Sequence, residues 1–326
     1  MDSLINQTHK NIEIVIINDG STDNTKQIIQ DYMSKDSRII YIENKENMQL
    51  YETLCIAYEN VTGDYITVCD ADDFLHIEAC TILLAKAIET NADMVTSNWL
   101  CQDTEKFNNT IHFPATEIKG KDVLQTWMNH EYRTSKSGSL ISKSIIDKFL
   151  EITPRNLALS HAEDALMFLQ IHFLVQHKIH IDIATYAYRK NINSTSSTKF
   201  ISSCITRVHD YGVMILYTKL FLEENNIYDQ YQKEYISTYN WHLYDSLACL
   251  YNISNTEKVV NVLQKLPSNI QKVYLEFLLK KVYEDDLISV SVIMRNKWYD
   301  FGLMTRNQKI KHLIKYILRK LGLKFI

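Results

Sequence analysis

Three carboxylates stand within four positions at the end of an apolar run in this chain. The run at 65–69 has the composition of a buried strand, and Asp70, Asp72 and Asp73 follow it directly. In open α/β sheets, ligands bind outside the carboxyl ends of the strands. Crowded carboxylates repel one another, and Mg²⁺ or Mn²⁺, which prefers oxygen ligands and is usually shared with substrate phosphates, would relieve that repulsion. The cluster therefore suggests a metal-assisted reaction on a phosphorylated substrate.

The same cluster has two other interpretations. Asp favours turns and helix N-caps, so Asp72 or Asp73 could simply cap a helix that begins near Leu75. A phosphohydrolase could use Asp70 as nucleophile and Asp72 as acid. Such motifs usually lie on the first strand and continue with Thr or Val, whereas Asp73 and Phe74 continue this one, on the third expected strand. The phosphohydrolase is therefore the weakest of the three interpretations.

A second polar cluster follows the apolar run at 12–17. It spans residues 18–23 and contains Asp19 and Gly20. Asp19 could accept hydrogen bonds from a nucleotide base, Gly20 allows close backbone approach, and the N-terminus of the following helix favours anions. An ordinary strand-to-helix turn with a Ser or Asp cap would contain the same residues.

A third cluster opens the helix that is expected at 162–176. Glu163 and Asp164 fall in its first turn, where the helix dipole favours acids, so capping is the simple explanation. An Asp in this place could also serve as a general base if the fold brings it to a substrate.

Strand and helix signals alternate through the first part of the chain, up to about residue 98. Strands are expected at 12–17, 38–42, 65–69 and 93–98, and helices at 21–33, 49–59 and 77–89. This alternation implies parallel strands that are joined by crossover helices. All three acidic clusters are thus expected at ends of regular elements.

The later part of the chain is organised differently. A strand is expected at 180–189, and the polar run at 191–198 is typical of a loop or a domain boundary. From about residue 200 onward the pattern is helical almost throughout.

The order and spacing of these clusters resemble the family 2 glycosyltransferases of the GT-A fold. The matching segments are 18–25, 62–66, 70–73, Glu163-Asp164 with Phe168, and 186–189 followed by 194–196. The resemblance implies an α/β chain with a GT-A (Rossmann-like), mostly parallel sheet flanked by helices, followed by an all-helical C-terminal region. The nucleotide-sugar-binding catalytic domain would span 1–197, and the helical domain 198–326.

The resemblance also implies how a donor would bind. The donor would be a nucleotide-diphospho-sugar, most commonly a UDP-sugar. Asp19 would contact the base, and Asp70 would help hold the nucleotide through its ribose or the metal. Asp72 would coordinate Mg²⁺ or Mn²⁺, which would stabilise the charge of the leaving diphosphate. Arg189 could pair with a phosphate.

On the acceptor side, the resemblance implies that Asp164, next to Glu163, would act as general base. It would take the proton from an acceptor hydroxyl as that oxygen attacks the anomeric carbon, and one such displacement inverts the anomeric configuration. The expected acceptor is a glycan or a lipid-linked molecule in the synthesis of surface polysaccharide.

Two departures from the family pattern suggest an alternative. The family usually opens with a strand that is central in its sheet, whereas Met1 matches the middle of the helix after that strand, so the chain is expected to be truncated at its N-terminus. Leu54 and Cys55 stand where relatives carry an Arg-Asn pair, so another basic residue would have to help organise the donor site. The alternative is a truncated, non-catalytic transferase-fold protein that acts as a binding or assembly partner.

Composition narrows the class of protein. The chain has 326 residues, of which 46% are hydrophobic and 23% charged, as in ordinary globular proteins. A formal net charge of −4 gives no basic field for nucleic acid, so no nucleic-acid partner is expected. The six cysteines form no CxxC and show no zinc-ligand spacing, which suggests free thiols in a reducing cytosol.

The end of the sequence is basic and amphipathic. Residues 306–326 contain seven Lys or Arg and no acid, with apolar residues between them at helical spacing. A helix of this kind can lie on an anionic membrane surface, or it can dock on its own protein with a basic outer face. With no signal peptide and no apolar run of about 20 residues, the expected location is the cytoplasm, with peripheral contact at the inner face of the plasma membrane.

Overall fold

The computed structural model describes residues 1–103, 106–129, 136–189, 200–254 and 256–283. The chain divides into two compact units, Met1–Ser194 and Thr195–Ile326. The polar run at 191–198 and the basic segment at 306–326 lie outside the described residues.

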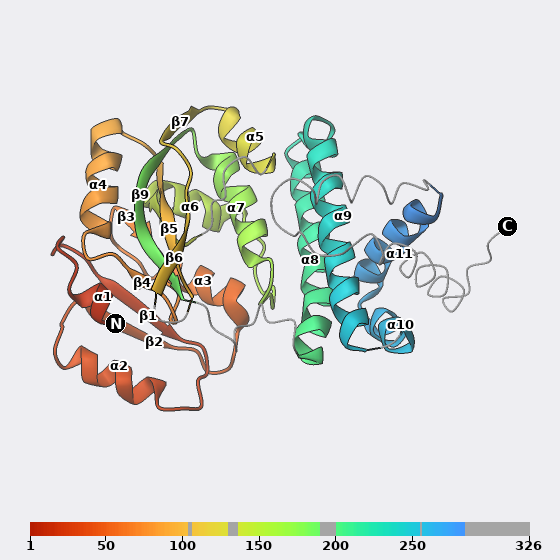
Figure 1. The fold of residues 1–326 in the computed structure, drawn as a ribbon, viewed down its shortest axis with the longest axis horizontal. Coiled ribbons are helices and arrows are strands. Elements are labelled where there is room, and N and C mark those ends of the chain that lie inside the picture. Colours follow the sequence, from red (N-terminus) through yellow and green to blue (C-terminus); the bar gives the residue numbers. More distant parts are fainter. Residues whose placement is uncertain (104–105, 130–135, 190–199, 255, 284–326) are drawn as a thin grey trace. The chain divides into compact units, whose positions relative to one another are not determined.

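Unit 1 alternates strands and helices, as expected, but contains more short strands than the sequence indicates (Figure 1). Its strands are β1 (Ile14–Asn18), β2 (Ile39–Glu43), β3 (Tyr65–Thr67), β4 (Phe74–Leu75), β5 (Met94–Asp103), β6 (Lys106–Ile111), β7 (Thr116–Lys119), β8 (Ser139–Ser142) and β9 (His177–Arg189). Its helices are α1 (Asp2–Ile5), α2 (Thr25–Met33), α3 (Gln49–Glu59), α4 (Ala79–Thr90), α5 (Asp122–Met128), α6 (Lys143–Ile152) and α7 (Glu163–Leu174). The expected strands and helices of residues 12–98, 162–176 and 180–189 are all present within a few residues of their predicted bounds.

The strands form two sheets. One has seven strands with the central order β3-β8-β5-β9-β4, to which β6 adds on β5 and β7 on β9. Within this sheet only β5 and β9 pair in parallel, and the other described ladders are antiparallel. The expectation of a mostly parallel sheet is therefore wrong in this respect, because the short strands β4, β6, β7 and β8, which the sequence does not signal, all enter antiparallel. The α/β class itself is confirmed.

The strands β1 and β2 form a separate, parallel two-stranded sheet. A side chain, Glu13, links the start of β1 to the segment before β3, where its Oε1 accepts a hydrogen bond from Gly63 N at 2.9 Å and its Oε2 one from Thr62 Oγ1 at 3.0 Å. That the chain lacks a first strand stays a prediction.

The seven-stranded sheet is covered by helices on both faces (Figure 1). On one side, Leu83 and Ala87 of α4 pack with Val95 of β5 and Ile179 of β9 in a continuous apolar cluster. On the other side, α7 is buried around most of its circumference, which is typical of a helix enclosed in a core. The rigid core therefore fixes the first turn of α7, where two candidate site residues lie.

Unit 2 consists of helices, as expected from about residue 200. They are α8 (Ile201–Glu224), α9 (Tyr228–Ile253), α10 (Thr256–Lys265) and α11 (Ser268–Tyr283). A disulfide joins Cys204 of α8 to Cys249 of α9, so the expectation that all cysteines are free is wrong. Spacing could not reveal this pair, because the fold of two long helices brings together residues that are 45 positions apart. Among the described helices, none is both long and apolar enough to cross a membrane.

Candidate active site

The acidic loop after β3 is held in place by an aromatic residue of β9. The Asp70 backbone N–H donates to the Tyr186 hydroxyl at 3.2 Å, and that hydroxyl donates to Asp73 Oδ2 at 2.6 Å. Arg189 N, three positions further along β9, donates to Asp73 Oδ1 at 2.8 Å. Asp73 is therefore buried and acts as a structural tie, whereas Asp70 and Asp72 in the same loop are only half-buried.

The capping interpretation of this loop is wrong. The helix α4 begins at Ala79 with Glu78 as its N-cap residue, and no side chain caps it by a hydrogen bond. Asp73 is instead followed by the short strand β4, which pairs with β9.

Replacing Asp73 tests this tie. Asp73→Ala would leave the buried Tyr186 hydroxyl and the Arg189 N–H without their acceptor, so we expect the free energy of unfolding to fall by about 1–3 kcal/mol. Asp73→Asn keeps one carbonyl oxygen and should cost less. Urea unfolding of both variants measures the difference, and an alanine variant as stable as the parent would show that Asp73 holds nothing.

At the start of α7, Glu163 and Asp164 face a lysine that the sequence did not indicate. Lys136 is buried, with 6% of the residue exposed, and its Nζ lies 3.1 Å from Glu163 Oε1 and 3.4 Å from Asp164 Oδ1. The same Nζ lies 3.6 Å from Asp70 Oδ2. One ammonium group thus joins two of the predicted clusters, although no motif or spacing marks Lys136 in the sequence.

The buried position of this cluster changes its acid–base properties. Burial raises the pKa of Asp164 to about 6, and the Lys136 charge opposes that rise. Burial likewise raises the pKa of Asp70, again with Lys136 acting against it. A carboxylate with a pKa near 6 is well suited to take a proton at neutral pH.

A cavity of about 280 Å³ opens over these groups. It is lined by Asp70, Trp99, Lys136, Ser137, Asp164, Tyr186 and Tyr188. Aromatic faces beside carboxylates can bind a ring that carries hydroxyl groups, because the rings cover its apolar side while the carboxylates accept its O–H groups. The cavity therefore combines aromatic faces with carboxylates, a lining that suits a hydroxyl-bearing ring.

The predicted base contact, Asp19, lies in the turn after a strand of the small sheet. Asp19 follows β1, and its Oδ1 accepts hydrogen bonds from Asn44 Nδ2 at 2.8 Å and from Met48 N at 2.7 Å. Gly20 has φ +72°, and a Cβ there would come within 3.1 Å of Asn47 N, so this turn needs glycine. The turn is thus a preformed structure on the small sheet, whereas Asp70 follows a strand of the large one.

Asp72 is part of the acidic loop, and Arg189 of β9 contacts that loop through its backbone N–H. Asp72 is partly buried, and its charge adds to the effect of burial in raising the pKa of Asp73. The Arg189 guanidinium lies over the ring of Phe74, 5.4 Å from its centroid. Among the residues that the structure describes, no three His, Cys, Asp or Glu side chains gather into a metal-binding group. The roles of these residues therefore stay predictions.

The basic residue that relatives carry in α3 has no counterpart there. Leu54 and Cys55 are both buried in the core of unit 1. Arg155 contacts α3 instead, where its guanidinium forms ion pairs with Glu52 and Glu59. Lys136, by contrast, brings its ammonium group close to Asp70, Glu163 and Asp164.

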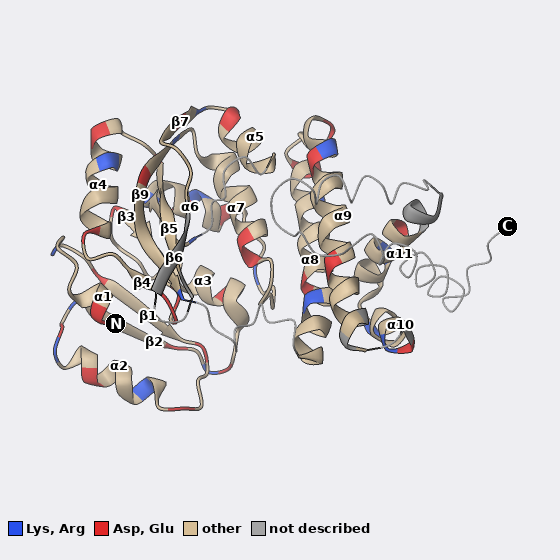
Figure 2. Cartoon of the chain, in the orientation of Figure 1, with Lys and Arg blue, Asp and Glu red and all other residues tan. Residues whose placement is uncertain are grey.

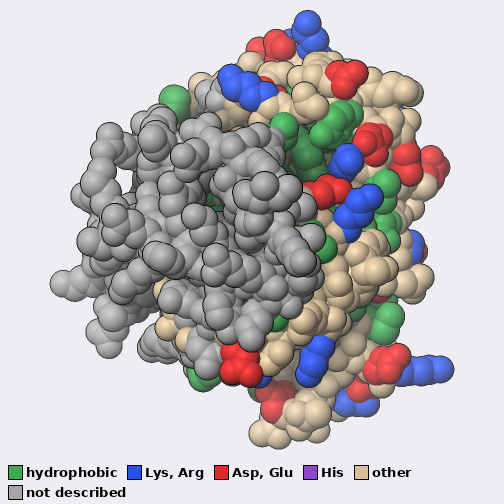
Figure 3. Space-filling model, turned by 90° about the vertical axis from the view of Figure 1, so that its right-hand side faces the viewer, with side chains coloured by type: hydrophobic (Ala, Val, Ile, Leu, Met, Phe, Trp, Pro, Cys, Tyr) green, Lys and Arg blue, Asp and Glu red, His purple; other side chains and the backbone are tan. Residues whose placement is uncertain are grey.

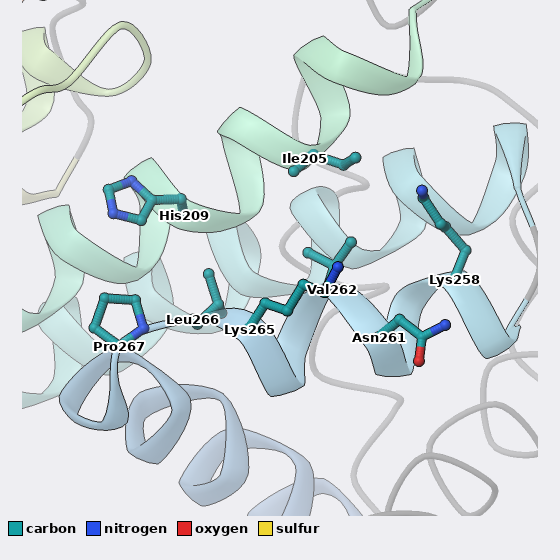
Figure 4. A pocket seen from close by; sticks show the side chains of 8 residues that line it. All are labelled: Ile205, His209, Lys258, Asn261, Val262, Lys265, Leu266 and Pro267. Atoms are coloured by element: carbon teal, nitrogen blue, oxygen red, sulfur yellow. The ribbon is translucent and has the colours of Figure 1, made fainter.

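A second cavity lies within unit 2 and has a volume of about 700 Å³. Figure 4 shows its lining residues on α8, on α10 and in the connection to α11, which are Ile205, His209, Lys258, Asn261, Val262, Lys265, Leu266 and Pro267. The cavity is therefore mainly apolar with two lysines, and none of the predicted site residues line it.

Charges on the rest of the described surface are mixed. Lys or Arg and Asp or Glu both occur on the outer helices α2 and α4 (Figure 2). On the visible part of the face in Figure 3 the two signs are interspersed. The coloured part of the face in Figure 3 therefore has no extended basic patch.

Comparisons with known proteins find similarity to glycosyltransferases. Residues 1–150 match the family model described as glycosyl transferase family 2. Glycosyltransferase GlyA of Streptococcus pneumoniae is 31% identical over a match of 205 positions that covers 60% of this chain and 29% of GlyA. Glycosyltransferase GlyG of the same species is 25% identical over 61% of this chain and 68% of GlyG. The chain thus spans less than a third of GlyA and about two thirds of GlyG.

Among solved structures, residues 1–349 of S. aureus TarS in complex with UDP-GlcNAc share the fold. The TM-score is 0.52 at 14% sequence identity, and the match covers 93% of this chain and 88% of the TarS chain. This likeness confirms the expected GT-A architecture.

Proposed function

We propose, from the match of residues 1–150 to the family model described as glycosyl transferase family 2, that this chain transfers a sugar from a nucleotide-diphospho-sugar to a hydroxyl group with inversion. Asp164 is the general base of this reaction. UDP-sugars are the first donors to test, because the TarS neighbour was solved with UDP-GlcNAc.

One observation carries this proposal. Lys136 brings Asp70, which follows β3, and Asp164, which opens α7, to the same cavity of about 280 Å³. A donor-site acid and a candidate base with a raised pKa thus face one space. This is the arrangement that direct displacement at a sugar carbon requires.

In the proposed reaction, Asp164 acts on the acceptor and the other predicted site residues act on the donor. The acceptor hydroxyl gives its proton to the Asp164 carboxylate while its oxygen forms a bond to the anomeric carbon. The bond between that carbon and the diphosphate oxygen breaks, and the nucleoside diphosphate leaves with the electron pair. Asp19, Asp70 and Arg189 are assigned to the donor, as base, nucleotide and phosphate contacts respectively.

The carboxylate oxygens of the acidic loop are the kind of ligand that a hard divalent cation prefers. Asp72 would offer its oxygens to Mg²⁺ or Mn²⁺, and a diphosphate could supply further oxygens. When bound, the metal would stabilise the negative charge of the leaving diphosphate. Asp72 is the residue that would hold it.

Removal of the metal tests this assignment. We expect transfer from UDP-sugars to stop in EDTA and to return with Mn²⁺, and Asp72→Ala to lower kcat by about 100-fold, since metal charge stabilisation is worth several kcal/mol. Asp147→Ala, at an exposed position on α6, is the matched control and should keep full activity. Transfer that survives both EDTA and Asp72→Ala undiminished would remove the metal from the proposal.

The acceptor is proposed to be a glycan or a lipid-linked glycan in surface polysaccharide synthesis. The apolar cavity of unit 2, with Lys258 and Lys265 in its lining, supports a lipid-linked acceptor, because a lipid phosphate combines an apolar chain with negative charge. Peripheral contact of residues 306–326 with an anionic membrane, at the cytoplasmic face, belongs to the same proposal.

A non-catalytic binding role is not favoured. Asp70 of the loop and Asp164 of α7 both line the cavity, and the relatives GlyA and GlyG are named as glycosyltransferases.

A further inference from the structure

Lys136 has a role that no motif of the sequence indicates. We infer that Lys136 is a positioning residue whose ammonium group holds Asp164 and Asp70 in the geometry that sugar transfer needs. The inference rests on the proposed function, because it concerns the same cavity. It adds a residue that lies between the two acids.

The backbone on the C-terminal side of Lys136 is fixed tightly against β5. Trp99 Nε1 donates to the Ser137 carbonyl at 3.0 Å, and Ser97 N donates to the Gly138 carbonyl at 2.9 Å. Gly138 has φ +70°, and a Cβ there would lie 2.7 Å from Trp99 Nε1. Only glycine fits this close approach, so the start of the Lys136 side chain is set by β5.

The ammonium group meets three carboxylates with three N–H donors. It lies 3.1 Å from Glu163 Oε1, 3.4 Å from Asp164 Oδ1 and 3.6 Å from Asp70 Oδ2. A compact ammonium suits this task, because it can direct separate N–H groups at acceptors on different elements. Without it, three carboxylates would face one another in a largely buried space, which is strongly unfavourable.

Glu163 and Asp164 share Lys136 unequally. Glu163 makes the shortest contact and is 7% exposed, whereas Asp164 and Asp70 both line the cavity. Glu163, which does not line the cavity, therefore anchors the ammonium group. The ammonium group in turn orients Asp70 and Asp164, which do line it. This arrangement assigns Glu163 a positioning role beside the base.

The chain offers a matched control for removing this lysine. Lys178 on β9 is also buried, at 0% exposed, but its Nζ contacts His172 Nε2 at 3.3 Å. Lys178→Met and Lys136→Met thus delete the same buried group in the same unit. Only the second deletion touches the acidic cluster.

The experiment compares kcat and KM of these variants in the full chain with a UDP-sugar. We expect Lys136→Met to lower kcat by at least about 100-fold, on the scale of a lost proton transfer, and also to raise the donor KM, because Asp70 loses the charge that orients it. Lys136→Arg should recover part of kcat, and Lys178→Met should keep it. A Lys136→Met enzyme with parental kcat, or an equal loss in Lys178→Met, would overturn the inference.

Folding is checked by thermal unfolding of each variant. If Lys136→Met does not fold, Glu163→Gln replaces it, and we expect about a tenfold lower kcat because the ammonium loses its anchoring charge. A Glu163→Gln enzyme with unchanged kcat would then overturn the inference. Asp164→Asn distinguishes a failure of the inference about Lys136 from a failure of the proposed function. If Asp164→Asn is inactive while Lys136→Met is active, only this inference fails; if Asp164→Asn is active, the proposed function fails.

Discussion

Asp164→Asn is expected to lower kcat for sugar transfer by about 10²- to 10⁴-fold, the range that general base catalysis contributes. The amide keeps the shape of the side chain and can still accept a hydrogen bond from Lys136, but it cannot take the proton of the acceptor hydroxyl. Donor affinity should stay within about threefold, because Asp164 acts on the acceptor. Steady-state kinetics and calorimetry with the donor measure the two effects separately.

The acidity of Asp164 adds a pH dependence to this prediction. Burial raises its pKa to about 6, and the base works only when it is deprotonated. The parental kcat should therefore fall as the pH drops through about 6. The exposed Asp147→Asn variant is the control, and its kcat and pH profile should match the parent's. An Asp164→Asn enzyme with more than a tenth of parental kcat would show that another group takes the proton.

Lys178→Met is expected to raise the free energy of unfolding at pH 6–7 by about 2–4 kcal/mol. Burial lowers the pKa of Lys178 to about 7, from the usual value of about 10.4 in an unfolded chain. Its described polar neighbour, His172, carries no negative charge, and its Nδ1 contacts the Phe168 carbonyl oxygen at 2.7 Å. Each unit of pKa difference corresponds to about 1.4 kcal/mol, from which the lost contact with His172 subtracts about 1 kcal/mol.

The sign of this effect fixes how it varies with pH. Because the pKa of Lys178 is lower in the folded state, the unfolded chain binds the extra proton between about pH 7 and 10.4. The stability of the parent should rise with pH over that range. The advantage of Lys178→Met should therefore be complete below about pH 7 and shrink toward pH 10.

Urea unfolding at pH 6.5, 8 and 9.5 measures this dependence. The fluorescence of Trp127, whose ring stacks on His172 with centroids 5.6 Å apart, reports on this part of unit 1. Lys148→Met, at an exposed position on α6, should leave stability nearly unchanged. A Lys178→Met protein that is less stable than the parent at every pH would mean that the ammonium forms a favourable contact in the folded state.

Much of unit 1 could be predicted from its sequence, because its long elements carry clear periodicity. The helix at 49–59 appears at the predicted bounds, and the expected strand at 93–98 forms the first part of β5. The short strands could not be predicted. β4 has two residues and β8 has four, so neither offers enough positions for a pattern. Their antiparallel pairing is decided by tertiary contacts.

The candidate site divides in the same way. Asp70 and Asp164 could be proposed, because each lies at the end of a regular element where ligands commonly bind. Lys136 could not, because it follows a segment without periodicity, and a single lysine carries no signal of burial. Asp73 is the opposite case. Its place in the cluster suggests a ligand-binding acid, yet its carboxylate accepts hydrogen bonds from the Tyr186 hydroxyl and from Arg189 N.

Gly138 gives the site an unusual sensitivity. It contributes no atom to the cavity and has no functional group, yet the space that its missing side chain leaves to Trp99 determines where Lys136 begins. In a saturation screen for transfer activity, substitutions of Gly138 should therefore be as damaging as those of the acids of the site, although Gly138 does not line the cavity. Selection for activity would therefore keep glycine at position 138 as strictly as it keeps the carboxylates of the site.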